Sequence, residues 1–568
     1  MYFLALAIDY DGTLATDGAV DGRTLKELQR LKESGRKLLM VTGRELPDLK
    51  RVFPDLHIFD RVVAENGAFL YTPKTEEERE LTPAPPAVFV NRLRSEKVPV
   101  SVGRGIVATW KPHETAVLNA IRDLGLELQI IFNKGAVMVL PAGVNKASGL
   151  AAALAELELS PHNVAGIGDA ENDHAFLSAC GLAVAVANAL PMLKESADIV
   201  LNAARGDGVC ELIEKVIEDD GGLAPVKRHG IVLGRSNKGY DVHLHSARRG
   251  VLIAGSSGIG KSTLATALTE RMTERCFQFC VFDPEGDYQE LENAVVVGNA
   301  KSPPRVEEVL DLLRSPATNV VINTLALAME ERPALFAKLL PELSKMRTAT
   351  GRPHWLLIDE SHHLLPSASG SAALTLPREL PATIFITVHP DMMSRDALAS
   401  VGSVVALGEK AMDVLRTFSA AIDGPAPPHT GPPDKSQILY WDRESDRAPE
   451  PVAVDGPRQS HKRHTRKYAE GDLAERSFFF RGPQNRLNIR VQNLQLFLQI
   501  AEGVDDETWE HHLRAGEYSN WFRICIKDDE LADEATAIEG DRALDAAESR
   551  RRIAAAISSR YTGPAKHE

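Results

Sequence analysis

The N-terminal apolar run, residues 2–8, ends abruptly on Asp9, and Asp11 follows two residues later. Continuous apolar character is typical of a strand buried on both faces of a parallel sheet. Residues i and i+2 of a strand point the same way, so we expect both carboxylates to share one crevice at the strand's carboxyl end. Open α/β sheets bind their ligands at that edge. The sequence therefore predicts a Rossmann-like sheet around this carboxylate pair.

Three further element boundaries in the first 221 residues carry polar side chains. An apolar strand at 37–41 ends on a threonine, an alanine-rich helix starts with a lysine near 146, and a strand at 163–168 runs into an acidic cluster. Strands that alternate with helices in this way indicate a parallel sheet. The polar residues concerned are Thr42, Lys146, Asp169, Asn172 and Asp173.

These residue types suit the transfer of a phosphoryl group to a carboxylate. An aspartate can act as nucleophile and form an aspartyl-phosphate, and a second carboxylate can protonate the leaving oxygen and later activate water. So many anionic oxygens require a hard cation, and Mg²⁺ fits this requirement. Thr42 and Lys146 can bind the phosphoryl oxygens and stabilise the charge of the transition state.

Four motifs stand in a fixed order: D-Y-D-G-T at 9–13, V-T-G-R at 41–44, N-K-A-S-G-L at 145–150 and G-D-A-E-N-D at 168–173. Together they make residues 1–221 resemble the haloacid dehalogenase (HAD) superfamily of phosphatases. The resemblance implies that Asp9 is the nucleophile and Asp11 the general acid/base. It further implies phosphate binding by Thr42, Lys146 and Asn172, and a Mg²⁺ site that draws on Asp9, Asp11, Asp169 and Asp173.

The insert at about 68–140 alternates strand and helix patterns and predicts a small α/β cap. In the resembled family such a cap covers the site and selects the substrate, and this one is of the compact kind found in sugar-phosphate and phosphoglycolate phosphatases. Arg104, Asn133 and Lys134 are polar candidates at cap loop tips for contact with an anionic substrate. Ordinary solvated surface is the alternative for each taken singly. The substrate is expected to be a small phosphorylated compound.

A second centre follows the apolar strand at 250–254, where the chain reads G-S-S-G-I-G-K-S-T and then enters a helix. Glycines let backbone N–H groups close on phosphate, and the helix N-terminus adds a favourable dipole. Lys261 would neutralise charge on the β- and γ-phosphates, and the Ser262 hydroxyl would bind Mg²⁺. The predicted ATP contacts are Gly255, Gly258, Gly260, Lys261, Ser262 and Thr263.

The partner motif W-L-L-I-D-E lies about a hundred residues downstream, at 355–360. Asp359 would hold the Mg²⁺ shell, and Glu360 would polarise the attacking water. A glutamate at this position favours hydrolysis over kinase chemistry, because an ATPase needs a base for water. The next apolar strand, 382–387, leads to His389, which could sense the γ-phosphate.

Residues 230–408 also resemble the HerA/FtsK class of P-loop ATPases. The marks are the phosphate loop, F-D-P-E-G-D-Y at 282–288, L-I-D-E-S-H-H-L at 357–364 and T-V-H-P at 387–390. The resemblance implies a RecA-like domain, and members of the class form rings that pump DNA. The N-terminal β-barrel of that class is reduced here, and the arginine-rich stretch that supplies its trans-acting arginine finger is missing. The remaining candidates for such a finger are Arg378, Arg395 and Arg416. ATP hydrolysis is thus the firmer expectation, and ring assembly is a hypothesis.

The chain of 568 residues is too long for one core and is expected to be a multidomain α/β protein. The predicted parts are the phosphatase at 1–221, a linker at 222–229, the ATPase at 230–422, a proline-rich and basic linker at 423–470 and a helical domain at 471–568. An edge strand is expected at 437–441, inside the proline-rich linker. Trp509, Trp521 and Phe522 are expected to form the core of the last part, and a partner-binding face is the alternative.

The net charge of −14 argues against a chain built mainly to coat nucleic acid, although it leaves room for a local basic groove. The N-terminal run lacks a basic leader, and no apolar run approaches the ~20 residues of a membrane helix. We therefore expect a cytoplasmic protein without a membrane partner.

Two rival functions stay open: a nucleic-acid end-processing or translocating ATPase with an end-healing phosphatase, and an ATP-gated oligomeric scaffold or defence protein. The capped phosphatase and Glu360 argue against the first, and the intact acid pairs weaken the second.

Overall fold

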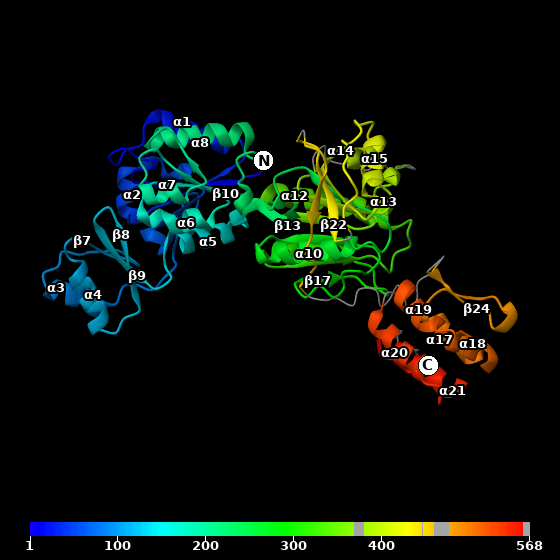
Figure 1. Ribbon diagram of the computed structural model, residues 1–568. Coiled ribbons are helices and arrows are strands. Elements are labelled where there is room, and N and C mark those ends of the chain that lie inside the picture. The colour runs from blue at the N-terminus through cyan, green and yellow to red at the C-terminus, as the bar shows by residue number, and fades with distance from the viewer. Residues whose placement is uncertain (368–379, 435, 446, 459–475, 527, 561–568) are drawn as a thin grey trace. The chain divides into compact units, whose positions relative to one another are not determined.

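The structure is a computed structural model that describes residues 1–367, 380–434, 436–445, 447–458, 476–526 and 528–560. It divides into two compact units, residues 1–458 and 459–568. The multidomain α/β architecture expected from the sequence is confirmed (Figure 1). In the described part of the chain, every helix is too short or too polar to cross a bilayer.

The first sheet has the expected nucleophile strand at its centre. Strand β1 (Ala5–Ile8) is fully buried and pairs in parallel with β2 (Lys37–Val41) on one side and β10 (Val164–Gly168) on the other. The carboxyl ends of these three strands therefore meet at one edge. The other strands are β3 (Arg61–Ala64), β4 (Phe69–Thr72), β5 (Glu77–Glu80), β11 (Leu182–Ala185) and β12 (Ile199–Val200). The helices are α1 (Gly22–Glu33), α2 (Leu46–Val52), α5 (Lys146–Glu156), α6 (His174–Ala179), α7 (Pro191–Ser196) and α8 (Arg205–Asp219).

The predicted cap is present as a four-stranded antiparallel sheet in the order β6-β7-β9-β8 with two helices (Figure 1). Its elements are α3 (Ala87–Ser95), β6 (Ser101–Val102), β7 (Val107–Trp110), α4 (Glu114–Asp123), β8 (Leu128–Asn133) and β9 (Ala136–Pro141). Phe89, Leu93, Val117 and Val137 are completely buried between the helices and the sheet. The cap thus has a small core of its own.

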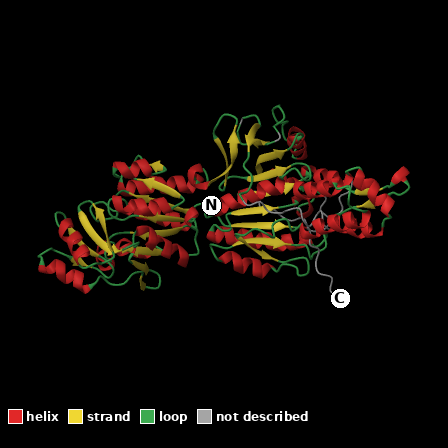
Figure 2. Ribbon diagram, turned by 60° about the horizontal axis from the view of Figure 1, so that its bottom comes forward, coloured by secondary structure: helices red, strands yellow, loops and turns green. Residues whose placement is uncertain are grey.

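The second large sheet has the order β14-β13-β23-β22-β21-β15-β20-β19-β16-β18-β17 and lies between layers of helices (Figure 2). Strand β15 (Gly250–Ala254) is buried throughout: Leu252 packs on one face, and Val251 and Ile253 pack on the other. The remaining parallel strands are β16 (Phe279–Asp283), β17 (Ala294–Val297), β18 (Asn319–Asn323), β19 (Trp355–Ile358), β20 (Thr383–Thr387) and β21 (Val401–Leu407). The helices are α9 (Val226–His229), α10 (Lys261–Glu274), α11 (Val306–Arg314), α12 (Arg332–Thr350), α13 (Ser361–Leu364), α14 (Arg395–Ala399) and α15 (Ala411–Ala421).

Two strands from the segment expected to be a linker join this sheet. Strand β22 (Gln437–Asp442) pairs antiparallel with β21, and β23 (Glu450–Ala453) continues to β13 (Gly230–Ser236), which pairs with β14 (Asp241–His245). The sheet therefore extends past residue 422. The short stretch at 222–229 includes α9, whose last residue, His229, is buried.

Four histidines lie in the contact between the first domain and the P-loop domain: His162, His229, His245 and His354. Nδ1 of His354 accepts the Gln278 N–H at 2.8 Å, so its Nε2–H donates to the Ser160 hydroxyl at 2.7 Å. His229 Nε2 donates to the Gly181 carbonyl, also at 2.7 Å. Burial disfavours the charged form of these imidazoles and lowers the pKa of His229 to about 3 and those of His162 and His245 to about 4.

We expect acid to weaken this contact. Because the folded pKa of His229 lies below the unfolded value of about 6.5, its contribution is complete above pH 6.5 and is lost as the pH falls towards 3. At pH 5 the loss is about 2 kcal/mol for each such histidine. Urea unfolding at pH 7 and at pH 5 measures how far the free energy of unfolding falls between the two. This fall should be about 2 kcal/mol smaller in His229→Gln than in wild type. The exposed His57→Gln is the control, and equal differences in all three proteins would contradict the expectation.

The C-terminal unit is mainly helical, as expected, with one two-stranded ribbon, β24 (Phe478–Phe480) and β25 (Ile489–Val491). Its helices are α17 (Leu494–Gly503), α18 (Asp506–Arg514), α19 (Glu517–Trp521), α20 (Asp529–Gly540) and α21 (Ala546–Arg560). Trp509, Trp521 and Phe522 are all buried, which confirms the predicted core. The rings of Trp509 and Tyr518 stack with their centroids 4.5 Å apart.

Candidate functional site

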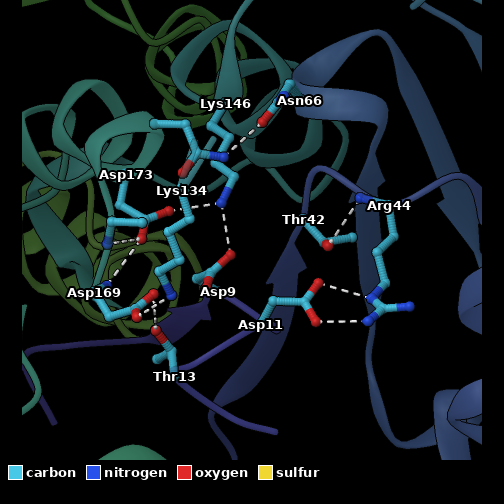
Figure 3. A network of polar contacts seen from close by, with 12 residues as sticks. Asp9, Asp11, Thr13, Thr42, Arg44, Asn66, Lys134, Lys146, Asp169 and Asp173 are labelled. Carbon is cyan, nitrogen blue, oxygen red and sulfur yellow. Dashed lines mark hydrogen bonds and ion pairs between the residues drawn. The ribbon is translucent and has the colours of Figure 1, made fainter. Parts of the chain in front are cut away.

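The predicted nucleophile, Asp9, is buried at the end of β1 beside a buried ammonium group. Lys146 Nζ, at the start of α5, lies 2.6 Å from Asp9 Oδ1 and 2.6 Å from Asp173 Oδ1 (Figure 3). Asn145 caps this helix through its side chain and thereby fixes the position of Lys146. Residues from three distant parts of the sequence thus meet where β1 and β10 end.

Three carboxylates gather at this point with ligand oxygens within 4.8 Å of one another: those of Asp9, Asp169 and Asp173. Burial raises the pKa of Asp9 to about 8, and the charge of Asp173 adds to the effect while Lys146 opposes it. Asp173 Oδ2 accepts the backbone N–H groups of Asp169 and Ala170, both at 2.9 Å, which orients the group. Clustered oxygen donors with an excess of negative charge are the ligands that Mg²⁺ prefers, so these residues fit the expected metal.

Asp11 lies apart from these three carboxylates. Arg44 Nε and Nη2 donate to its two oxygens, each at 2.7 Å, and the Asp11 side chain is 42% exposed (Figure 3). A solvent-facing carboxylate two positions along the chain from Asp9 is suited to exchange a proton with a leaving group or with water. Its expected part in the metal site stays a prediction. Arg44 was not predicted as a site residue, although it stands in the same V-T-G-R motif as Thr42.

Thr42 and Asn172 are both buried at this edge of the sheet. Thr42 Oγ1 accepts the Arg44 N–H at 3.1 Å at the end of β2. Asn172 Nδ2 donates to Asn66 Oδ1 at 2.9 Å, whereas its Oδ1 has no hydrogen-bond partner among the residues that the structure describes. Asn172 therefore offers an acceptor that a bound molecule could use. Their role in phosphate binding stays a prediction.

The cap contributes one charged side chain to this site. Lys134 Nζ lies 2.6 Å from Asp169 Oδ2 (Figure 3). Gly12 makes the approach possible, because a Cβ there would lie 2.7 Å from Lys134 Nζ and 2.4 Å from Asp169 Oδ2. Arg104 instead pairs with Glu78 at 2.7 Å. Of the three polar cap candidates, Lys134 thus contacts the carboxylate cluster, whereas Asn133 Oδ1 is buried without a hydrogen-bond partner among the residues that the structure describes.

The phosphate loop has the conformation that its glycines allow. Gly258 and Gly260 have φ values of 74° and 102°, which disfavour other residues. Lys261 Nζ donates to the Gly255 and Ser256 carbonyls at 3.0 Å, and Ser262 Oγ donates to Asp287 Oδ2 at 3.2 Å. Thr263 is exposed on the first turn of α10. The structure thus groups the predicted loop residues at one helix N-terminus.

Asp287 was not predicted as a site residue. It follows β16, and Asp283 holds its loop by accepting the backbone N–H groups of residues 286–288 at 2.7–3.0 Å. The signal was available in the acidic F-D-P-E-G-D-Y motif, but the sequence does not say which of its carboxylates faces the phosphate loop.

The second ATP motif ends β19 with a buried carboxylate and a strained residue. Burial and the charges of Glu360, Asp287 and Asp283 raise the pKa of Asp359 well above its usual value. Glu360 has φ 43° and ψ 44°, a left-handed conformation that is costly for a glutamate and typical of functional sites. His389 is exposed after β20, and its ring centroid lies 5.6 Å from that of His362. Its predicted role as a sensor stays untested.

The three arginines considered as trans-acting fingers give no further support for a ring. Arg378 lies outside the described residues. Arg395 pairs with Asp423 at 2.6 Å and Arg416 with Asp413 at 3.0 Å.

Comparisons with known proteins agree with both resemblances. Residues 6–115 and 122–213 match the family described as haloacid dehalogenase-like hydrolase, and residues 230–354 match the central domain of helicase HerA. Phosphoglycolate phosphatase of Methanothermobacter thermautotrophicus is 32% identical over 223 residues, which are 37% of this chain and 97% of that protein. Phosphoglycolate phosphatase 2 of Saccharolobus solfataricus is 29% identical over 39% of this chain and 94% of its own length. A haloacid dehalogenase-like hydrolase from Bacteroides thetaiotaomicron matches in structure with a TM-score of 0.34 and 18% identity, over 38% of this chain and 99% of that one.

Proposed function

Through its first domain this chain belongs to the haloacid dehalogenase-like hydrolases, and on that basis we propose that it is a Mg²⁺-dependent phosphomonoesterase with an ATP-hydrolysing P-loop domain. The observation that carries the first part is the position of Asp9, buried at the end of β1 and paired with Lys146 at 2.6 Å. A carboxylate fixed in this way has one oxygen held by a cation and the other available for attack.

In the proposed reaction, the second carboxylate oxygen of Asp9 attacks the phosphorus atom and the bond from phosphorus to the leaving oxygen breaks. Asp11 gives its proton to that oxygen, so the alcohol leaves neutral. Asp11 then takes a proton from water, which attacks the aspartyl-phosphate and releases inorganic phosphate. Lys146 and Thr42 bind phosphoryl oxygens during both steps.

A magnesium ion would be held by Asp9 and Asp169, with Asp173 orienting them and Asp11 as the further predicted ligand. When bound, it supplies positive charge to the phosphoryl oxygens and favours the ionised form of the nucleophile. The raised pKa of Asp9 supports this requirement, since a neutral carboxyl group is a poor nucleophile.

For the second part, Lys261 and Ser262 would bind the phosphates and Mg²⁺ of ATP, with Asp359 completing the metal shell. Glu360 would orient the attacking water. Its strained backbone conformation supports a functional role at this position. Ring assembly and a cytoplasmic location belong to the proposal as hypotheses.

The metal requirement gives a direct test of the phosphatase. We expect release of phosphate from 2-phosphoglycolate, the compound named in the relatives, or from a sugar phosphate, to stop after treatment with EDTA and to return with added Mg²⁺. The physical reason is that three carboxylates share only two ammonium groups, those of Lys134 and Lys146, so the cluster keeps negative charge for a cation. Full activity in EDTA would contradict the proposal.

A further inference from the structure

A cavity of about 360 Å³ lies in the contact between the first domain and the P-loop domain. The first domain lines it with Tyr2 and Leu4, which precede β1, and with Asn163, which precedes β10. The P-loop domain lines it with residues that include Arg347 on α12 and His354 before β19. Segments that are far apart in the sequence therefore build one site together.

This cavity lies away from both catalytic centres. Asn163 and His354 stand directly before the first residues of β10 and β19, whereas Asp169 and Asp359 directly follow the last residues of the same strands. Residues at opposite ends of a strand lie at opposite edges of its sheet. A molecule bound in the cavity would thus be distinct from the substrates of either proposed activity.

Arg347 brings a positive charge into the cavity, whose lining contains no aspartate or glutamate. Its Nη2 donates to the His354 and Pro381 carbonyls at 3.2 and 2.7 Å, whereas Nε and Nη1 have no acceptor among the residues that the structure describes. Burial lowers the pKa of Arg347 to about 10, so the group stays charged at pH 7. A partly buried cation without a counter-ion is costly, and an anion from solution would relieve that cost.

The hydroxyl groups of the lining are already bonded within the protein. The Tyr2 hydroxyl donates to Nδ1 of His229, whose Nε2 is a donor, and accepts from Ser246 at 2.6 Å. Ser344 and Thr348 donate to carbonyl groups of α12 itself. The charged N–H groups of Arg347 are therefore the donors that remain for a ligand.

We propose that this cavity binds a small oxyanion, a phosphate or a carboxylate, on the guanidinium of Arg347. Both classes offer several oxygens to the N–H groups of Nε and Nη1, and hydrogen bonds between two charged groups are among the strong ones. The volume is at the lower end of the range for small-molecule sites, which suits a metabolite and not a polymer. Because both domains line the cavity, a bound anion also stabilises their contact.

Hydrogen exchange of the full-length protein, with inorganic phosphate as the probe and without Mg²⁺ or ATP, tests the proposal. Phosphate should slow exchange in segments 160–164 and 344–354, which line the cavity from the two domains. Phosphate held in a catalytic site would act instead on 41–44 or 255–263, so position separates the sites. Sodium acetate shows whether carboxylates bind as phosphates do, and sodium chloride of equal ionic strength should have no effect.

Three variants show whether Arg347 holds the anion. Arg347→Met should raise the phosphate concentration that gives half of the protection at 344–354 by about 10- to 100-fold, because charge-assisted hydrogen bonds are lost. Arg347→Lys keeps the charge but loses the planar set of donors, so a rise of about threefold or more is expected. Lys345→Met is the matched control, since Lys345 lies on the same helix with its side chain 73% exposed and pairs with Glu342.

Absence of any phosphate effect at 344–354 in wild type would overturn the proposal. An unchanged half-saturating concentration in Arg347→Met would overturn it too, as would an equal effect of chloride, which would indicate simple screening. If Arg347→Met does not fold, Arg347→Lys decides, and a value equal to that of wild type contradicts the proposal.

Discussion

Replacement of Asp9 by asparagine is expected to lower kcat for phosphomonoester hydrolysis by about 10⁴-fold or more, since loss of a nucleophile removes the covalent route. An amide has almost the same shape as the carboxylate but cannot form the phosphoenzyme. ATP hydrolysis should stay within about twofold of wild type, because the phosphate loop lies in another domain. Phosphate release from 2-phosphoglycolate, with single-turnover trapping of labelled protein, measures the effect.

The variant should also remain folded. In the metal-free protein, burial and the charge of Asp173 disfavour ionised Asp9, so the neutral asparagine leaves Lys146 paired with Asp173 alone. We expect the free energy of unfolding at pH 7 to be unchanged or higher by about 1 kcal/mol. Asp17→Asn, at a side chain 89% exposed, is the matched control. Activity above about 1% of wild type in Asp9→Asn would contradict a nucleophilic role.

Replacement of Lys261 by alanine is expected to lower ATP turnover by about 10³-fold, because one fixed cation at the transferred phosphoryl group is lost. Lys261 is buried at the mouth of the phosphate loop, where its ammonium contacts the Gly255 and Ser256 carbonyls. Hydrolysis of phosphomonoesters should be retained. Steady-state ATP turnover measures the effect.

The exposed Lys301→Ala serves as the control for a general change of charge. If Lys261→Ala keeps more than about a tenth of ATP turnover, the loop does not act as the proposed ATP site.

The arrangement of the nucleophile site could be predicted because its residues follow buried strands. Asp9 and Asp169 end β1 and β10, which pair in parallel. Parallel strands of one sheet bring their carboxyl ends to one edge, so local pattern alone places these carboxylates together. Lys146 joins them because its helix packs on the same sheet, and the Asn145 side chain caps that helix so that it begins at Lys146.

The choice of ion-pair partners could not be predicted in this way. Asp11 was expected beside Asp9, but it turns towards Arg44, and the pairing depends on how β2 continues into α2. Lys134 reaches Asp169 across 35 positions of sequence. Such contacts depend on how the cap docks on the core, and the periodicity of a single sequence does not predict that docking.

One edge strand was predicted inside the expected linker, at 437–441, and β22 confirms it. Its pairing with β21, and the second strand, β23, that pairs with β13, were not predicted, because proline-rich surroundings do not indicate which sheet a strand joins. The histidines between the two domains carry no motif. Their partners, such as Ser160 and Gln278 around His354, come from both domains.

The most direct test of the central proposal measures phosphate release from 2-phosphoglycolate and from ATP by wild type, Asp9→Asn and Lys261→Ala in the same buffer with Mg²⁺. Two separate sites predict a crossed pattern: Asp9→Asn loses only the first activity, and Lys261→Ala loses only the second. Loss of both activities in either folded variant would contradict the independence of the sites. Phosphomonoester hydrolysis that persists in Asp9→Asn would contradict the assignment of Asp9 as the nucleophile.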